Sequence, residues 1–190
     1  DEPLYRYEGD ALPTQAGWLA ANACDGACVQ SVEDGHFVTT YPIGGDPHNF
    51  DRVISRAPDL PPPTLWVEWG FRSTQRMPRT AYTCDAYFSV NYRAVRQDVY
   101  ILGDAIVNGS GDFFVLGLDI DEFHTYRFES PDGLNYWFSV DGLIFMDRQA
   151  NPGLGSNYLQ FGGQSGCGPA YHPKINEWDF IRYGTISYGD

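Results

Sequence analysis

The sequence predicts an all-β protein, a sandwich of short antiparallel strands, and three observations support this prediction. Apolar and polar residues alternate along residues 64–72 and again along residues 85–93, and a period of two places successive side chains on opposite faces of a strand. Gly, Pro, Asn and Asp interrupt the chain at the short intervals typical of β-sandwiches. Aromatic residues make up 16% of the chain, which supplies bulky side chains for a core between two sheets.

Further β-rich segments follow in order. The predicted strands are residues 64–72, 85–93, 99–106, 113–118, 124–129, 135–140, 143–147, 158–161 and 177–183. The longest stretch without Gly or Pro, residues 79–102, has a period nearer two than 3.6, which favours strands over a helix. Ser130-Pro131-Asp132-Gly133 and Asp141-Gly142 separate consecutive strands, and Asp-Gly provides the positive φ that tight hairpin turns need.

Three consecutive prolines, residues 61–63, would suit a linker between two domains. A split at this point would leave two pieces that each lack a closed β architecture. We therefore interpret the prolines as a stiff lead-in to the strand at 64–72. We expect one domain, residues 1–190, because a chain of this length buries enough surface for a single core.

The chain is strongly acidic. Its 25 Asp and Glu residues exceed its 12 Lys and Arg residues and give a formal net charge of −13. Such a charge repels phosphate backbones, so we expect no nucleic acid partner. No apolar run approaches the roughly 18 residues that a membrane-spanning helix requires, so we also expect no membrane span.

The cysteines indicate an oxidising compartment, and the chain contains Cys24, Cys28, Cys84 and Cys167. An even number favours disulfides, and of the three possible connectivities we expect Cys24–Cys28 and Cys84–Cys167. A zinc site is the alternative, but zinc usually takes two closely spaced pairs, and Cys84 and Cys167 have no cysteine neighbours. We therefore expect a secreted or extracellular protein.

Four motifs follow one another in the C-terminal half. They are Phe123-His124-Thr125-Tyr126-Arg127-Phe128-Glu129, Tyr136-Trp137-Phe138-Ser139-Val140-Asp141-Gly142, Leu159-Gln160-Phe161-Gly162-Gly163-Gln164-Ser165 and Glu177-Trp178-Asp179-Phe180-Ile181-Arg182-Tyr183. This series resembles the concanavalin A-like lectin/glucanase superfamily, and it is most similar to laminin G-like domains and family 16 glycoside hydrolases. The resemblance implies a jelly-roll sandwich of two curved antiparallel sheets, with the ligand groove on the concave sheet.

The resemblance also implies a structural calcium ion on the convex side of the sandwich. In the superfamily this ion is held by an acidic residue near the N-terminus, by backbone carbonyls and by an Asp of the terminal strand, all oxygen ligands that suit calcium. Asp179 matches the terminal position, and Glu8 or Asp10 matches the first. The alternative for Asp179 is an ordinary solvated or hydrogen-bonded strand residue.

The catalytic pattern of the related hydrolases is missing. Retaining glycosidases need two carboxylates about 5 Å apart, and the hydrolase relatives carry them on one strand as Glu-x-Asp-x-x-Glu. The nearest strings here, residues 67–69 and 118–122, lack this spacing. We also interpret His124 as a packed, hydrogen-bonded residue rather than a catalytic one. The sequence therefore leans away from an enzyme.

Sugars combine apolar ring faces with many hydroxyl groups, so flat aromatic and planar polar side chains bind them. In the strand at 64–72, Trp66 shares a face with Glu68 and Arg72, opposite Val67 and Trp69. The candidate ligand-binding residues are Trp66, Glu68, Arg72, Asp85, Tyr87, Asn91 and Arg93. For any one aromatic residue the alternative is a place in the core.

We therefore expect a secreted, non-catalytic β-sandwich module that binds a polysaccharide or another glycan on its concave sheet. One alternative is a glycoside hydrolase or polysaccharide lyase with a diverged site. Another is a structural or adhesive extracellular subunit that self-assembles through sheet edges or attaches to a larger extracellular protein.

Overall fold

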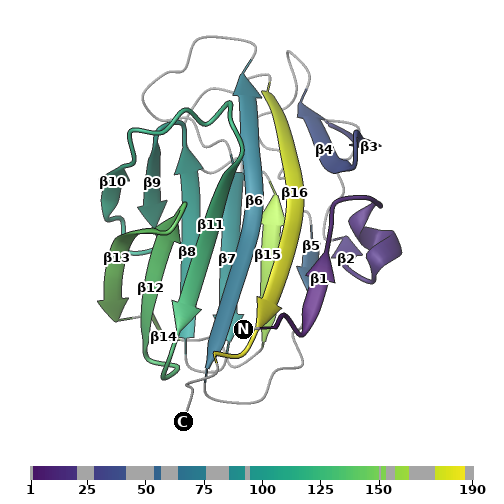
Figure 1. Ribbon diagram of the computed structural model, residues 1–190. Helices are drawn as coiled ribbons and strands as arrows, with labels where there is room; N and C mark the ends of the chain where they lie inside the picture. The colour runs from purple at the N-terminus through teal and green to yellow at the C-terminus, as the bar shows by residue number, and fades with distance from the viewer. Residues whose placement is uncertain are drawn as a thin grey trace.

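The computed structural model describes residues 2–20, 28–41, 54–56, 64–75, 86–92, 95–149, 151–152, 157–162 and 174–186. These residues form two antiparallel sheets, with sheet A in front of sheet B in Figure 1. Within the same ranges the 3-10 helix η1 (Pro13–Ala16) is the only helix, and no described helix is long and apolar enough to cross a membrane. The predicted all-β jelly-roll sandwich is confirmed.

Sheet A has the strand order β13-β12-β11-β6-β16-β4-β3, and β1 also pairs with β16. Its strands are β1 (Tyr5–Tyr7), β3 (Val29–Glu33), β4 (His36–Tyr41), β6 (Leu65–Gln75), β11 (His124–Ser130), β12 (Asn135–Val140), β13 (Leu143–Gln149) and β16 (Lys174–Gly184). The long strands β6 and β16 lie at its centre. Three of the four C-terminal motifs supply β11, β12 and β16 to this sheet, and the motif that begins at Leu159 falls in β15 (Tyr158–Gly162) of the other sheet.

Sheet B has the strand order β10-β9-β8-β7-β15-β5-β2, and β14 also pairs with β8. Its strands are β2 (Leu19–Ala20), β5 (Ile54–Arg56), β7 (Ala86–Tyr92), β8 (Val95–Leu102), β9 (Ala105–Asn108), β10 (Phe113–Val115), β14 (Asn151–Pro152) and β15 (Tyr158–Gly162). Each pairing in it is antiparallel.

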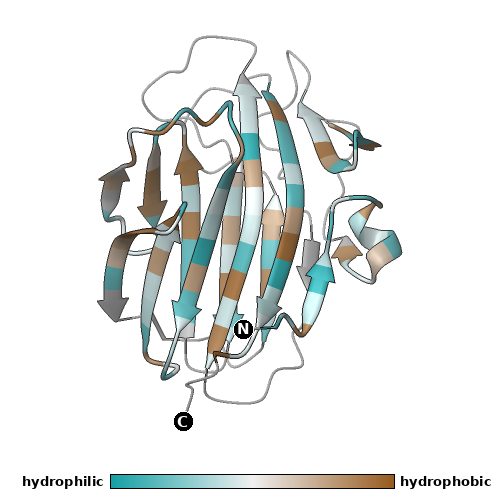
Figure 2. Ribbon diagram, in the orientation of Figure 1, coloured by the Kyte–Doolittle hydropathy of each residue, from teal (hydrophilic) through white to brown (hydrophobic). Residues whose placement is uncertain are grey.

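Aromatic residues of β6 and β7 join the two sheets. Trp69 of sheet A stacks on Phe88 of sheet B, with ring centroids 3.8 Å apart and an interplanar angle of 4°. Tyr126 and Phe138 pack against the same indole from β11 and β12. The other core-facing residues of β6 are Leu65, Val67 and Phe71, which alternation places on the same face as Trp69. The resulting change of hydropathy along the strands is visible as bands in Figure 2.

One predicted strand, residues 99–106, is wrong. The structure divides it into β8 and β9, which pair with each other through Leu102 and Ala105. Gly103 adopts a φ of 62° in the turn between them, a conformation that glycine adopts without steric cost. The prediction missed this turn because alternation continues on both sides of it.

Two Asp-Gly turns close hairpins of sheet A. Asp141-Gly142 joins β12 to β13 as predicted, with φ values of 50° and 79°. Asp34-Gly35 joins β3 to β4 with φ values of 50° and 82°. Positive φ at both central residues matches the right-handed twist of the flanking strands.

The cysteine pairing stays a prediction. Cys28 is disulfide-bonded, and no cysteine among the described residues is a free thiol. The three other cysteines lie outside the described residues and are Cys24, Cys84 and Cys167.

His124 connects the Asp141-Gly142 turn to the start of β11 through side-chain contacts. Its Nδ1 lies 2.6 Å from Oδ2 of Asp141, and its Nε2 lies 2.8 Å from the carbonyl oxygen of Asp119. Oδ1 of Asp141 accepts a hydrogen bond from the backbone N–H of Thr125 at 2.8 Å. These contacts confirm that His124 is hydrogen-bonded, and its structural rather than catalytic role stays a prediction.

We expect Asp141→Ala to lower the free energy of unfolding by about 2 kcal/mol, because it removes both side-chain acceptors and strains the turn. Asp141→Asn should cost less, since Asn tolerates positive φ and keeps one acceptor. Asp147→Ala, at an exposed position on the adjacent strand, is the control and should change stability by less than about 0.5 kcal/mol. Urea denaturation measures all three, and equal losses for Asp141→Ala and Asp147→Ala would contradict the role of this turn.

Asp132 organises the turn between β11 and β12. Hydrogen bonds from the backbone N–H groups of Asn135 and Leu134 lower the pKa of Asp132 below its ordinary value of 3.8. A carboxyl group with a lower pKa in the folded state stabilises the fold when ionised, and this contribution is lost as the pH falls through the folded-state pKa.

We therefore expect wild type to exceed Asp132→Ala in stability most clearly at neutral pH. The difference should shrink as the pH falls below about 4, where the unfolded-state carboxyl already binds a proton. Urea titrations of both proteins over this range measure the effect, with Asp104→Ala, in the β8–β9 turn, as the control. A difference that grows on acidification would contradict the assignment.

Candidate functional site

The structure divides the predicted ligand-binding residues between two faces. Trp66, Glu68 and Arg72 of β6 point away from the core, on the outer face of sheet A, whereas Tyr87 and Asn91 of β7 lie on the outer face of sheet B. These faces lie on opposite sides of the sandwich, so one site cannot contain both groups. Periodicity missed this because it assigns faces within a strand and does not say which sheet the strand joins. Outside the described residues lie Asp85 and Arg93.

Trp66 is covered by its neighbours, with only 3% of its surface exposed. The guanidinium of Arg127 lies over its ring, 4.7 Å from the centroid, and its Nε1 donates to the carbonyl oxygen of Thr185 at 3.2 Å. A Cβ added to Gly184 would lie 2.9 Å from the indole nitrogen. Trp66 therefore does not offer a ring face to a ligand.

The charged side chains of this face pair with one another. Nε and Nη2 of Arg72 donate to the two carboxylate oxygens of Glu177 at 2.9 and 2.8 Å, a bidentate geometry that fixes both groups. Arg127 donates to Glu68 at 3.2 Å and to Glu129 at 2.8 Å. Glu68 and Arg72 thus each pair with an oppositely charged side chain of the outer face of sheet A.

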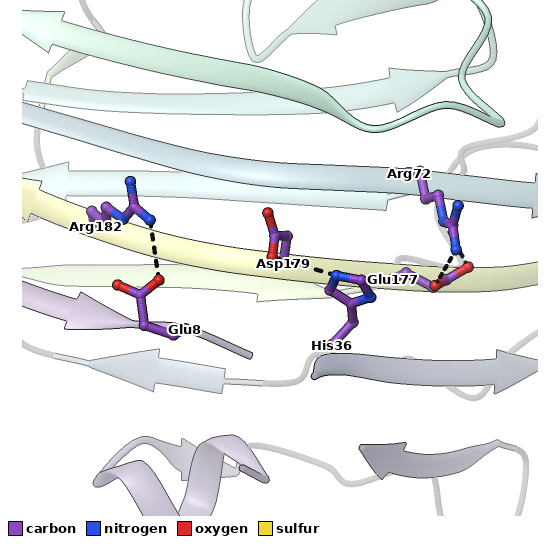
Figure 3. Close-up of polar contacts among 6 residues, drawn as sticks. All are labelled: Glu8, His36, Arg72, Glu177, Asp179 and Arg182. Carbon is purple, nitrogen blue, oxygen red and sulfur yellow. Dashed lines mark hydrogen bonds and ion pairs between the residues drawn. The ribbon is translucent and has the colours of Figure 1, made fainter. Parts of the chain in front are cut away.

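The predicted calcium ligands lie where β1, β16 and the β3–β4 hairpin meet (Figure 3). Asp179 of β16 lies 3.4 Å from Nε2 of His36, and Glu8 accepts a hydrogen bond from Arg182 at 3.0 Å. Asp10, two residues after Glu8 in the sequence, is exposed. Within the described part of the chain, no group of three or more His, Cys, Asp or Glu side chains is placed to hold a metal ion.

Backbone oxygens at this junction nevertheless suit calcium. A Cβ added to Gly9, which has a φ of 72°, would lie 2.6 Å from the carbonyl oxygens of Trp178 and Asp179 and 3.2 Å from that of Gly35. Three carbonyl oxygens thus converge near Gly9, and the carboxylate of Asp179, which contacts His36, belongs to the same strand as two of them. Calcium binds mixtures of carbonyl and carboxylate oxygens. The backbone carbonyl oxygens and the carboxylate of Asp179 are therefore suitable ligand types for this ion. Glu8 fits less well because Arg182 holds its carboxylate.

A polar cluster occupies the outer face of sheet B. Asp98 of β8 is only 7% exposed, and its Oδ1 accepts hydrogen bonds from Ser89 at 2.6 Å and from Tyr87 at 3.1 Å. Its Oδ2 lies 2.9 Å from Nη2 of Arg96. We call these four residues, Tyr87, Ser89, Arg96 and Asp98, the Asp98 cluster.

The pKa values of two members of this cluster, Tyr87 and Arg96, are raised above their ordinary values. Burial raises the pKa of the Tyr87 hydroxyl, and the adjacent Asp98 carboxylate raises it further, so this phenol stays neutral. Burial alone would lower the pKa of Arg96, but the charge of Asp98 and its hydrogen bond outweigh burial and raise the pKa above its ordinary value. The cluster therefore combines one ion pair with neutral hydroxyl groups.

The register places further polar and aromatic side chains around the cluster. Tyr100 lies opposite Tyr87 across β7 and β8, with ring centroids 5.2 Å apart. Tyr158 lies opposite Asn91, and Gln160 lies opposite Ser89. Ser89 and Asn91 are fully buried, whereas the three larger side chains are half-buried. The buried polar side chains of β7 thus lie beneath larger, half-buried side chains, two tyrosines and one glutamine.

Most residues of this site are absent from the ligand-binding residues that the sequence predicts. The predicted residues include Tyr87 and Asn91 but neither Asp98 nor Arg96, because the predicted strand began at residue 99. The side chains of Arg96, Asp98 and Tyr100 alternate with those of Gln97 and Val99. This alternation is the signal that would have extended the predicted strand back to residue 96.

The arrangement suits hydrogen bonding and ring stacking. Among the described side chains of β7, β8 and β15, Asp98 is the only carboxylate, and both of its oxygens have partners within the cluster. A retaining glycosidase needs a second carboxylate about 5 Å away. The described side chains of β7, β8 and β15 therefore do not contain such a pair of carboxylates.

No protein-family model matches the chain, and no curated protein sequence matches it. Solved structures do resemble it. One, from work on endo-acting O-glycanases with which prominent members of the human gut microbiota initiate mucin breakdown, aligns with a TM-score of 0.70 and 15% identity over 98% of this chain and 100% of the other. An endo-1,3-β-glucanase from Streptomyces sioyaensis aligns with a TM-score of 0.63 and 14% sequence identity, over 96% of this chain and 95% of the other.

A Bacillus licheniformis β-glucanase gives a TM-score of 0.61 and 13% identity over 96% of this chain and 98% of the other. Identities this low show the fold alone. The chain therefore has the concanavalin A-like β-sandwich fold of these glucanases, and its particular resemblance to laminin G-like domains stays a prediction.

Proposed function

We propose that this protein is a secreted or extracellular module that binds a carbohydrate on the outer face of sheet B, without two-carboxylate hydrolysis. The observation that carries the proposal is the Asp98 cluster, bordered by Tyr100 and Tyr158 on the same face. Tyrosine rings suit the apolar faces of sugar rings, and amide, guanidinium and hydroxyl groups suit sugar hydroxyls.

One further observation supports this side of the sandwich, and another supports the class of ligand. The outer face of sheet A is filled by paired charges and by Trp66 under Arg127, so it offers few unpaired polar groups. Structural neighbours described as glucanases and as a carbohydrate esterase also act on carbohydrates, which favours this ligand class.

We expect Tyr100→Ala and Tyr158→Ala each to weaken glycan binding by about tenfold or more, since a lost ring contact of about 1.4 kcal/mol corresponds to that factor. Trp137→Ala is the matched control, because Trp137 is a half-buried aromatic residue on the outer face of sheet A. A glycan array identifies the ligand, and calorimetry with it measures the dissociation constants.

Equal weakening by Trp137→Ala would contradict a site on sheet B. The same samples should be assayed for new reducing ends and for unsaturated sugar products. Product formation that disappears in Asp98→Asn would replace the binding proposal with an enzymatic one. Absence of glycan binding together with sedimentation as large assemblies would favour a structural subunit instead.

We further propose that calcium binds at the junction near Gly9, held by the Asp179 carboxylate and backbone carbonyl oxygens that include those of Asp179 and Gly35. The converging oxygens support this proposal. Such an ion would tie β1 and the β3–β4 hairpin to β16 and stabilise the sandwich.

We expect calcium in excess to raise the Tm by about 5 °C or more, because an ion that binds only the folded state adds to its stability. A chelator should reverse the shift, and Asp179→Asn should abolish it. Asp147→Asn, which removes an exposed charge elsewhere on sheet A, should keep it. Thermal unfolding followed by circular dichroism measures the shift. An equal response of Asp179→Asn and wild type would show that calcium binds elsewhere.

A further inference from the structure

The charges of the described side chains of β7, β8 and β15 on the outer face of sheet B cancel. Among the described side chains of β7, β8 and β15, Arg96 is the only cation and Asp98 the only anion, and they pair at 2.9 Å. The side chains that surround this ion pair are uncharged at neutral pH. They are Tyr100, Tyr158 and Gln160. The described site is thus electrically neutral in total.

Asp98 is fixed in its place beside Arg96. Ser89 and Tyr87 donate to one of its oxygens while Arg96 approaches the other. Its side chain is only 10% exposed, whereas that of Arg96 is 34% exposed. The carboxylate cannot turn away when a ligand arrives without giving up three contacts, and leaving buried donors unpaired is costly.

An anionic sugar therefore gains little from Arg96. A carboxylate or sulfate that reached the exposed edge of the guanidinium would also lie close to Asp98, and the repulsion would offset much of the attraction. The formal net charge of −13 adds a further long-range repulsion. A hydroxyl group meets neither penalty, because Arg96 donates to its oxygen and the neutral tyrosine hydroxyls pair with it.

We infer that the outer face of sheet B selects a neutral glycan over one that carries uronate or sulfate groups, with the Arg96–Asp98 pair as the specificity determinant. This inference rests on the proposed carbohydrate-binding function. It assigns Asp98 a positioning role: it orients Arg96, Ser89 and Tyr87 and removes the net charge of the guanidinium.

Asp98→Asn tests the inference because it leaves the Arg96 charge uncompensated. The probes are neutral gluco-oligosaccharides and oligogalacturonates of equal length, measured by calorimetry at low and at physiological salt. We expect wild type to bind a neutral probe at least about tenfold more tightly than the acidic one, which is about 1.4 kcal/mol. Asp98→Asn should shift this ratio towards the acidic probe by about tenfold, and salt should reduce the shift.

Asp104→Asn is the matched control, since Asp104 lies exposed in the β8–β9 turn and its loss changes the net charge equally. It should leave the ratio close to that of wild type. Arg96→Gln provides a second variant if Asp98→Asn does not fold, and it should retain the neutral preference because it leaves only a negative charge. Thermal unfolding verifies the fold of each variant.

A wild-type preference for the acidic probe would overturn the inference while leaving carbohydrate binding intact. An unchanged ratio in folded Asp98→Asn would also overturn it. Failure of wild type to bind any glycan on an array would overturn the proposed function and this inference together, so the two failures are distinguishable.

Discussion

The stacking of Trp69 on Phe88 is the contact on which the rest of the sandwich depends. It joins the central strand β6 of sheet A to β7 of sheet B, with ring centroids 3.8 Å apart. Because side chains alternate along a strand, turning these two rings inward turns Glu68 and Gly70 outward on one sheet and Tyr87 and Ser89 outward on the other. The core contact therefore decides which residues reach each outer face.

The two outer faces differ in what their polar groups do. On sheet A the charged groups form pairs such as Arg72–Glu177, and Trp66 lies beneath Arg127, so this face stabilises the sandwich. Among the described side chains of β7, β8 and β15, one ion pair, Arg96–Asp98, lies among neutral hydroxyl and amide groups. Of these two arrangements, only that on sheet B places tyrosine rings and uncharged polar groups at a partly exposed position where a sugar would contact them.

Much of the fold follows from local sequence. Alternation along residues 64–72 correctly divided the side chains of β6 between two faces, and Asp141-Gly142 correctly predicted the β12–β13 turn, because both depend on near neighbours. The site was harder to predict, since Trp66 and Tyr87 belong to consecutive strands of different sheets. Sheet membership and the Ser89–Asp98 contact arise from pairing between strands, which periodicity does not encode.

The central claim is that a carbohydrate binds the outer face of sheet B, and NMR chemical-shift mapping tests it most directly. Titrating a neutral oligosaccharide into isotopically labelled protein should perturb backbone amides of β7, β8 and β15 and side-chain signals of Tyr100, Tyr158 and Gln160. Amides of β6, β11 and β16 should stay nearly unchanged, since their outer face lies on the opposite side of the core. Perturbations confined to sheet A would contradict the account.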